Sequence, residues 1–406
     1  MAIGVVDIEA LITSFPGVEC ARSEEGLAVA LPSTAEQVAA VMCSVVGHEF
    51  AIEIAGARTK RGWSNAVLAD LVLGTSRLKG VREHRWQDLT ATVGAGTPWA
   101  MMQRELKKHG QFVALDPLWP EQATLGGVVA TNDSGALRLK YGSLRDLIIG
   151  MTIVLADGTV AKSGGKVVKN VAGYDLHKLM TGAFGTLGVI AEVTFRLHPL
   201  PAQTRVWGVT SRDPDVLGIL MMKIMDSQMS VQAVQMRGSK QGCALDVELA
   251  SQPDVIAQQA ERLNVLARGL GGSCEVQQGT ARWQFGVCEH LFNYDVVVKM
   301  TMLPSALPAL VREAIASGGS VAAQATGIML AGFSEAAAAN AIADLNEPVG
   351  RAGGSITILK ANLQQAASWT VQQRKRGDKL PELMRAVKEQ FDPKRTLNPG
   401  RMVGGV

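Results

Sequence analysis

Cysteine, histidine and long apolar runs are scarce in this sequence of 406 residues. The five cysteines are scattered, without the short spacings of a disulfide framework, a zinc site or an iron–sulfur cluster. We interpret them as free thiols in a reducing compartment and expect no metal site. No run of about 18 uninterrupted apolar residues occurs, and the N-terminus lacks the basic and apolar pattern of a secretion signal. A soluble, cytoplasmic protein is expected, which would reach the inner membrane only through a partner protein.

An excess of charge of either sign is also missing. Lys and Arg total 40 and Asp and Glu total 37, which leaves a formal net charge of +3. So small a net charge does not support binding to nucleic acid or to an anionic membrane surface. Apolar residues make up 47% of the chain, enough at this length to build more than one packed domain and to exclude a disordered chain.

Glycine, in contrast, is abundant, with 43 residues and most of the dense clusters in the first half of the chain. Such clusters mark tight turns or places where the backbone approaches something closely. Between the glycine clusters, capping boxes, a first-turn proline and an Asp-Gly hairpin signal predict short helices and strands. These are a helix starting within 32–37 and ending near 47, a strand over 51–55, a helix over 99–109 with Thr97 as its N-cap, a hairpin over 148–162, a short helix from Asp175 to Gly182 and a strand over 189–197. The mixture indicates an α+β domain.

The sequence Pro199-Leu200-Pro201 interrupts this pattern and is the predicted domain boundary. Beyond it, the order strand-helix-strand-strand-helix-strand occurs twice, which indicates two ferredoxin-like units that can share one sheet. The first repeat has strands near 205–210, 231–236, 245–249 and 273–277 with helices from 213 and over 253–270; the second has strands over 295–302, 321–324, 328–332 and 355–359 with helices over 304–316 and 334–346. The predicted domains are therefore 1–200, 201–390 and a C-terminal tail, 391–406.

The first candidate binding loop follows the predicted strand 51–55 and reads Ala55-Gly56-Ala57-Arg58-Thr59-Lys60-Arg61-Gly62-Trp63. A loop of this composition can present consecutive backbone N–H groups to a pyrophosphate. Thr59 adds a hydroxyl donor, and Lys60 or Arg61 would neutralise charge. The alternative interpretation is an ordinary basic surface turn.

A second candidate segment, residues 116–135, combines rigid prolines, paired glycines and small polar residues. Gly126 and Gly127 would let the chain approach a ligand closely. Hydroxyl donors would come from Thr124, Thr131 and Ser134. The alternative is a long loop at the edge of the core, although loops of this length are uncommon without a function.

Three further glycine-rich stretches follow. They cover residues 141–147, 164–176 and 182–190. Two common nucleotide-binding patterns are excluded there. Gly182, Gly185 and Gly188 have the wrong first spacing for a dinucleotide fingerprint, and they precede a strand instead of opening a helix. Gly165-Lys166 lacks the upstream glycine and the following Ser or Thr of a P-loop.

In their order along the chain, these motifs resemble the PCMH-type FAD-binding domain of the vanillyl-alcohol-oxidase family. The resemblance rests on the Thr59 loop, Thr124-Leu125-Gly126-Gly127, Tyr141-Gly142-Ser143-Leu144-Arg145-Asp146, Ala156-Asp157-Gly158, Lys169-Asn170-Val171-Ala172-Gly173-Tyr174-Asp175-Leu176 and Gly185-Thr186-Leu187-Gly188-Val189-Ile190. It covers about residues 22–200. The tail Phe391-Asp392-Pro393-Lys394-Arg395-Thr396-Leu397-Asn398-Pro399-Gly400-Arg401 is similar to the ending of FAD-linked 2-hydroxy-acid dehydrogenases. The fold implied is an FAD-binding domain followed by the tandem ferredoxin-like units.

The resemblance also implies roles for individual residues. The first loop would face the pyrophosphate, the second segment would line the flavin and its ribityl chain, the start of strand 189–197 would contact adenine, and Asn398 would lie near the isoalloxazine ring. The implied cofactor-binding residues are Gly56, Ala57, Arg58, Thr59, Lys60, Gly62, Pro117, Thr124, Leu125, Gly126, Gly127, Thr131, Ser134, Gly135, Tyr141, Gly142, Val189, Ile190 and Asn398. Family members with covalent flavin carry a histidine in the first loop. None lies between Gly56 and Ser64, so FAD should be non-covalent.

Within the family, the chain resembles the FAD-binding subunits of glycolate oxidases. Catalytic subunits of this branch carry a His-x-Gly-x-Gly-Asn-x-His motif, whereas this chain has a single histidine, His290, after residue 198. The resemblance implies a subunit of a complex that oxidises glycolate or D-lactate by hydride transfer to FAD. The implied partners are a catalytic flavoprotein subunit and an iron–sulfur subunit.

Residues for substrate chemistry are limited to two candidates. His290 could act as a base near the flavin, or could be an ordinary surface or core histidine. Arg374 could hold a substrate carboxylate, or could belong to a solvated basic turn with Arg376. Two other functions stay open: a non-catalytic electron-transfer or scaffold subunit, and an NADPH-dependent peptidoglycan-precursor reductase, against which the Asn398-Pro399-Gly400-Arg401 ending and the tandem repeat both argue.

Overall fold

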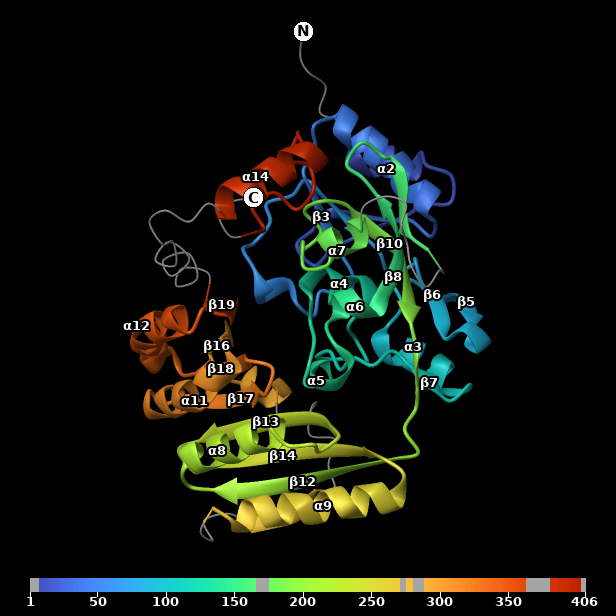
Figure 1. Ribbon diagram of the computed structural model, residues 1–406. Helices are drawn as coiled ribbons and strands as arrows, with labels where there is room; N and C mark the ends of the chain where they lie inside the picture. Colours follow the sequence, from blue (N-terminus) through green and yellow to red (C-terminus); the bar gives the residue numbers. More distant parts are fainter. Residues whose placement is uncertain (1–6, 166–174, 271–274, 280–287, 363–379, 403–406) are drawn as a thin grey trace. The chain divides into compact units, whose positions relative to one another are not determined.

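Figure 1 shows the computed structural model, which describes residues 7–165, 175–270, 275–279, 288–362 and 380–402. The chain forms two compact units. Unit 1 comprises Met1–Asp133, Ser143–Pro199 and Lys375–Val406, and unit 2 comprises Ser134–Gly142 and Leu200–Arg374. One of the boundaries between the units lies within the sequence Pro199-Leu200-Pro201, which was the predicted domain boundary.

These units differ from the predicted domains in two segments. Ser134–Gly142 belongs to unit 2 because Ala136 packs with Ala233 of that unit's sheet. Residues 375–390 belong to unit 1 because Val387 and Phe391 pack against its core. Both segments pack against residues that are distant in the sequence, and such long-range packing cannot be seen in the order of residues alone.

The first sheet of unit 1 has four strands in the order β1-β2-β4-β3. They are β1 (Glu19–Arg22), β2 (Ala28–Leu31), β3 (Ile52–Ala55) and β4 (Leu71–Gly74), accompanied by helices α1 (Ile8–Thr13) and α2 (Ala35–Gly47). Strands β2, β4 and β3 are parallel. Helix α2 and strand β3 confirm the predictions for these segments. The Thr34 hydroxyl caps α2 by accepting a hydrogen bond from Gln37 N, and the helix buries Val38, Val41 and Val45 against the sheet.

The second sheet of unit 1 is antiparallel and has the order β5-β6-β10-β8-β9. Its strands are β5 (Val81–Arg85), β6 (Thr90–Gly94), β8 (Ile148–Val154), β9 (Val160–Gly164) and β10 (Val189–Arg196). A separate two-stranded pair joins β7 (Gln111–Phe112) to β11 (His198–Pro199). The other described helices of unit 1 are α3 (Trp99–Lys107), α4 (Leu125–Thr131), α6 (Leu144–Leu147), α7 (Leu176–Met180) and α14 (Leu380–Phe391). Two 3-10 turns, η1 (Arg61–Trp63) and η2 (Trp86–Asp88), also belong to this unit. The predicted hairpin through Asp157-Gly158 is confirmed by the pairing of β8 with β9.

The prediction that Thr97 caps α3 is wrong by one residue, since Pro98 occupies the N-cap position. The Thr97 hydroxyl instead donates to Gly94 O at 2.7 Å and accepts from Gly80 N at 2.8 Å. Backbone carbonyls satisfy the first amides of α3, because Trp99 N donates to Ala123 O and Ala100 N to Pro120 O. A distant loop replaces the local cap.

A buried histidine joins β9 to α7 and gives a testable pH dependence. His177 Nδ1 lies 3.2 Å from Ser163 Oγ, and burial lowers the pKa of His177 below its usual value of 6.5. The unfolded chain therefore binds the proton more tightly, so the free energy of unfolding should fall as pH decreases below 6.5. We expect urea midpoints between pH 7.5 and 5 to fall less for His177→Gln than for the parent protein. Equal slopes would contradict this role.

Unit 2 contains one eight-stranded sheet in the order β15-β12-β14-β13-β17-β18-β16-β19. The strands are β12 (Gln203–Ser211), β13 (Val231–Ser239), β14 (Gly242–Ser251), β15 (Glu275–Gly279), β16 (Val296–Thr301), β17 (Ser320–Gln324), β18 (Ile328–Phe333) and β19 (Ser355–Lys360). Helices α8 (Pro214–Met225), α9 (Pro253–Arg268), α11 (Leu307–Ala316) and α12 (Glu335–Arg351) pack on the sheet through one apolar core, and α5 (Arg138–Tyr141) also packs against β13. Each half has the ferredoxin-like strand order, and the halves join where β13 pairs with β17. The prediction of two repeats sharing a sheet is confirmed.

Candidate functional site

The candidate site is built around the loop that follows β3 in unit 1. Because β3 lies at the end of a parallel set, its carboxyl end opens into a loop instead of a hairpin. Arg58 adopts a left-handed backbone conformation with φ of 57°, which turns the chain within the loop. The backbone N–H groups of residues 56–60 donate to no group in the described part of the chain. These amides are available to an anion.

A cavity lies against this loop, and every residue lining it belongs to unit 1. The lining residues are Glu53, Ile54, Ala55, Gly56, Ala57, Arg58, Thr59, Lys60, Arg61, Thr124, Gly127, Ala130, Thr131, Phe184, Asn398 and Arg401. Four segments far apart in the sequence thus form one site: the end of β3 with its loop, helix α4 with Thr124, the turn that contains Phe184, and the C-terminal tail. The predicted residues 56–60, Thr124, Gly127, Thr131 and Asn398 are brought together here.

The hydroxyl of Thr124 is a buried polar group without a hydrogen-bond partner among the described residues. Such a hydroxyl is costly unless a ligand completes it. Gly56 faces it so closely that a Cβ at position 56 would lie 2.2 Å from Thr124 Oγ1. A Cβ at Gly127 would lie 3.2 Å from the same atom. The two glycines leave open the space beside this donor.

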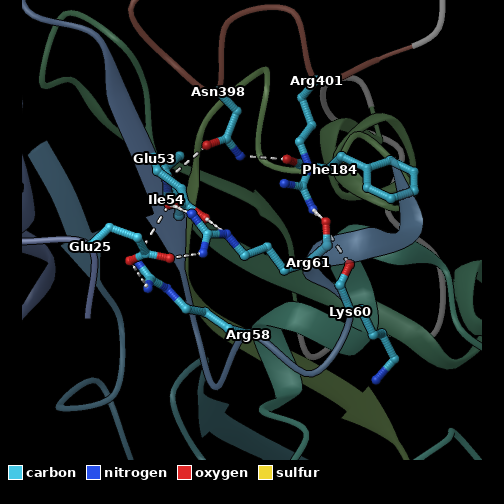
Figure 2. Close-up of polar contacts among 9 residues, drawn as sticks. All are labelled: Glu25, Glu53, Ile54, Arg58, Lys60, Arg61, Phe184, Asn398 and Arg401. Atoms are coloured by element: carbon cyan, nitrogen blue, oxygen red, sulfur yellow. Dashed lines mark hydrogen bonds and ion pairs between the residues drawn. The ribbon is translucent and has the colours of Figure 1, made fainter. Parts of the chain in front are cut away.

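Two arginines of the loop have carboxylate partners inside the protein (Figure 2). The Glu53 side chain, 5% exposed, lies 3.3 Å from Arg58 Nη2 and 3.2 Å from Arg61 Nε. Glu25 pairs with Arg58 at 3.2 Å and also with Arg61. The hydrogen bond from Arg61 is the main reason that the pKa of Glu25 falls to about 2. The four charges cancel, so these arginines brace the loop instead of adding net positive charge.

Lys60 also has a partner within the protein. Its side chain is buried, and Nζ lies 3.2 Å from Asp133 Oδ2 and donates to Leu118 O at 3.3 Å. The ammonium lies 5.6 Å from the ring centroids of both Trp63 and Trp119. Lys60 therefore ties the loop to segment 116–133, and its charge is compensated before any ligand arrives.

The C-terminal tail completes the cavity through Asn398. Asn398 Oδ1 accepts from Ile54 N at 2.8 Å, and Asn398 Nδ2 donates to Phe184 O at 2.6 Å (Figure 2). Arg401 Nη2 donates to Arg61 O at 2.8 Å, and burial lowers the pKa of Arg401. The tail thus crosslinks the loop after β3 to the turn 182–188.

Several lining residues were not among the predicted cofactor-binding residues, and Glu53, Phe184 and Arg401 are the most informative of them. Glu53 was treated only as part of a strand. For Phe184 and Arg401 the sequence contained a signal. Phe184 lies between Gly182 and Gly185, and Arg401 ends the tail motif in which only Asn398 was assigned a role. The structure adds that Phe184 has a positive φ of 53°.

Other predicted residues lie away from this cavity. Leu125 is buried in the apolar core, and a Cβ at Gly126 would lie 2.9 Å from Ala95 Cβ, so this glycine permits packing within the chain. Four predicted residues, Ser134, Gly135, Tyr141 and Gly142, belong to unit 2, where the Tyr141 hydroxyl donates to Gln232 Oε1 at 3.4 Å. The remaining cofactor candidates Gly62, Pro117, Val189 and Ile190 lie in unit 1 but do not line this cavity.

The two catalytic candidates stay predictions. His290 is exposed in unit 2, and its ring lies edge-on to Tyr294 with centroids 6.0 Å apart. Arg374 and the motif residues 166–174 lie outside the described residues. Within the described ranges, no group of three or more His, Cys, Asp or Glu side chains could hold a metal ion. Among the described helices, none has the length and apolarity needed to span a bilayer.

Residues 26–164 match the family of FAD binding domains, and residues 366–402 match the C-terminal domain of FAD linked oxidases. The segment 26–164 is therefore similar to FAD binding domains. The loop after β3, Thr124 and Gly127 all lie within this segment, and Asn398 and Arg401 lie within the second matched segment. The two matches therefore meet at the cavity.

Relatives similar to this chain include proteins named as D-lactate dehydrogenases and glycolate oxidase subunits. The chain is 34% identical over 181 residues to the mitochondrial D-lactate dehydrogenase [cytochrome] of Arabidopsis thaliana, covering 44% of this chain and 31% of the relative. It is 35% identical over 175 residues to glycolate oxidase subunit GlcD of Bacillus subtilis (43% and 37% covered), and 38% identical over 124 residues to subunit GlcE of Escherichia coli (30% and 35% covered). The matched parts span about a third of these relatives.

Solved structures share the fold along nearly the whole chain. The glucooligosaccharide oxidase of Acremonium strictum aligns over 98% of both chains with a TM-score of 0.74 and 14% identity. A p-cresol methylhydroxylase aligns over 93% of this chain and 88% of its own with a TM-score of 0.71 and 16% identity. Identities this low show the fold alone, and they confirm the predicted PCMH-type architecture.

Proposed function

We propose that this chain binds FAD non-covalently and acts as the FAD-binding subunit of a 2-hydroxy-acid dehydrogenase complex. The observation that carries the proposal is the conjunction of unused backbone amides at 56–60 with the unpartnered Thr124 hydroxyl, inside an FAD binding domain. Bound FAD would supply the hydride acceptor. The chain supplies the loop amides for the diphosphate and Thr124 as a donor, with Phe184 and Asn398 forming a wall.

The charges of the residues that line the cavity are compatible with a diphosphate. A diphosphate brings negative charge, and backbone amides can bind it without the desolvation of a further lysine or arginine. Arg401 lies at the cavity with no carboxylate within ion-pair distance among the described residues, which leaves one compensating cation in the lining. The test is an absorption spectrum of the purified protein after incubation with FAD; a properly folded protein that takes up no flavin would overturn the proposal.

Non-covalent attachment is supported by the lining itself. The glucooligosaccharide oxidase of Acremonium strictum carries a 6-S-cysteinyl, 8α-N1-histidyl FAD. The described residues that line the present cavity include neither histidine nor cysteine. We expect acid precipitation to release all of the flavin into the supernatant. Yellow colour that stays with the denatured protein would show a covalent bond.

For the substrate, we propose glycolate or D-lactate, and for the partners a catalytic flavoprotein subunit and an iron–sulfur subunit. The names of the relatives support this choice, and the scattered cysteines offer no cluster spacing within this chain. Anaerobic addition of glycolate or D-lactate to the flavin-loaded chain tests whether it reacts alone: bleaching supports a catalytic chain, and no bleaching favours an electron-transfer or scaffold role. Co-purification with tagged chain from its native host tests the partners.

Replacing Thr124 with Val should affect the empty and the FAD-bound protein in opposite directions. Valine keeps the shape but removes the unpartnered hydroxyl, so the protein without FAD should gain about 1 kcal/mol in the free energy of unfolding. Loss of one hydrogen bond to the ligand should weaken FAD binding by roughly 2- to 13-fold. Urea unfolding and fluorescence titration with FAD measure the two effects.

A matched control for this substitution is Thr131→Val. The Thr131 hydroxyl donates to Gly127 O at 2.7 Å, so it has a partner within the helix. We expect this variant to lose stability or stay unchanged, and to gain none. A loss of stability in Thr124→Val would contradict a hydroxyl reserved for a ligand.

A further inference from the structure

A buried ion pair lies outside the lining of the cavity, at the end of α14. The Lys388 and Asp392 side chains are 3% and 0% exposed, and Lys388 Nζ lies 2.6 Å from Asp392 Oδ2. Lys388 Nζ also donates to Thr186 O at 2.8 Å and to Leu397 O at 2.7 Å. All three hydrogens of the ammonium group are therefore used. The three acceptors come from α14's own end, the tail and the turn before β10.

Asp392 organises the tail from the other side of the pair. Its Oδ1 accepts from Thr396 N at 2.9 Å, and its Oδ2 accepts from Leu397 N at 2.7 Å. These bonds close a turn in which Arg395 has a positive φ of 54°. The tail leaves this turn directly alongside β3, since Ile52 N donates to Thr396 O at 2.8 Å. The carboxylate thus sets the point at which the tail meets β3.

Both segments held by this pair lead directly to the cavity. Leu397 precedes Asn398, whose backbone N donates to Ile52 O at 2.9 Å and whose side chain joins Ile54 N to Phe184 O. Thr186 lies two residues after Phe184 in the turn 182–188. Lys388 therefore bridges the two stretches of chain that carry the Asn398 and Phe184 wall.

Stability alone is a weak reason for such a pair. The desolvation of two buried charges offsets much of their attraction, so an apolar pair of similar volume is often equally stabilising. An apolar pair, however, has no directional preference. Three short bonds to three separate segments impose one register, which apolar packing of Leu397 would not impose.

We propose that Lys388 and Asp392 form a positioning pair that fixes the register of residues 396–398 against β3 and thereby places Asn398 and Phe184 in the cavity. The role of this pair in cofactor binding rests on the proposed binding of FAD. Neither side chain lines the cavity, so both act through Asn398 and Phe184.

Hydrogen exchange on the protein without FAD tests the pair independently of the cofactor. In Lys388→Met and Asp392→Asn, the amides of Leu397, Asn398 and Ile54 should exchange at least tenfold faster than in the parent. Amides of the β16–β18 pairing in unit 2 should keep their rates. The control is Glu389→Gln, which removes the exposed carboxylate 4.0 Å from Arg395 in the same segment and should change none of them.

The second measurement is the dissociation constant for FAD, together with the visible spectrum of the bound flavin. Lys388→Met should weaken FAD binding about tenfold or more and shift the flavin bands, because the wall formed by Asn398 is displaced, while Glu389→Gln matches the parent. If the parent protein bound no FAD, the proposed function would fail, but the exchange result would still decide the pair. Unchanged exchange at Ile54 and Asn398 in Lys388→Met would overturn the inference.

If neither variant folds, hydrogen exchange in the parent protein tests the positioning role of the pair. The amides of Thr396, Leu397, Asn398 and Ile54 should then open together with one common free energy, because one pair holds them. Separate openings, with Ile54 exchanging independently of Leu397, would overturn the positioning role.

Discussion

Gly56→Ala is expected to abolish or strongly weaken FAD binding. The new Cβ would lie 2.2 Å from Thr124 Oγ1 and 3.3 Å from Thr124 Cβ, so the loop or α4 must move. Overpacking of this kind costs about 1–3 kcal/mol, which corresponds to roughly 5- to 150-fold in the dissociation constant if the strain falls on the bound state. The methyl group would also occupy space beside the Thr124 hydroxyl. Titration with FAD, followed by flavin fluorescence, measures the loss.

A double variant separates damage to the fold from damage to the site. Thr124→Ala removes the oxygen 2.2 Å away and leaves only the 3.3 Å contact, so Gly56→Ala/Thr124→Ala should recover most of the lost unfolding free energy. FAD binding should stay weak, because both the donor and the open space are gone. Gly47→Ala, where a Cβ meets nothing within 4 Å, is the control for an innocuous glycine replacement. Recovery of tight FAD binding in the double variant would contradict a role for Thr124.

Glu53→Gln should weaken FAD binding even though it adds net positive charge beside the loop. Two forces oppose each other in this variant. Releasing Arg58 and Arg61 from Glu53 would attract a diphosphate, by about 1 kcal/mol at most for a solvent-exposed charge and less in salt. The loss of charged hydrogen bonds from a buried carboxylate costs about 1.5–3 kcal/mol and removes the brace of the loop. Loop order outweighs charge, so the dissociation constant should rise roughly 3- to 30-fold.

The sign of this change distinguishes two roles for the arginines. If Arg58 and Arg61 bound the pyrophosphate directly, Glu53→Gln would tighten FAD binding. The matched control is Glu25→Gln, at the exposed end of the same network, where the ion pairs are screened by solvent and a smaller effect is expected. Measuring both variants at low and high salt checks the argument, since only a direct role for the arginines would give a steep salt dependence.

The sequence by itself determined the local elements and the class of cofactor. The cap of α2 and the Asp157-Gly158 hairpin depend on bonds between near neighbours, so they could be predicted. The two ferredoxin-like repeats could be predicted because the same order of strands and helices occurs twice along the chain. The glycine-rich loop after β3 could also be predicted as an anion-binding loop, because its backbone amides and hydroxyl donors come from consecutive residues. Motif order then indicated an FAD-binding domain, and residues 26–164 match the family of FAD binding domains.

Only the tertiary structure decided what each charged residue does. Lys60, Arg58 and Arg61 looked like phosphate ligands in the sequence. Their carboxylate partners, however, are Asp133, 73 positions from Lys60, Glu25, 33 and 36 positions from Arg58 and Arg61, and Glu53 on the strand before the loop. Lys388 lies on α14 and Asp392 just after the end of that helix, four positions away, but the other acceptors of Lys388 are set by packing of the tail on β3. Electrostatic and hydrogen-bond partners depend on distances in space. Between residues that are far apart in the sequence, those distances are set only when the chain has folded and its core has packed.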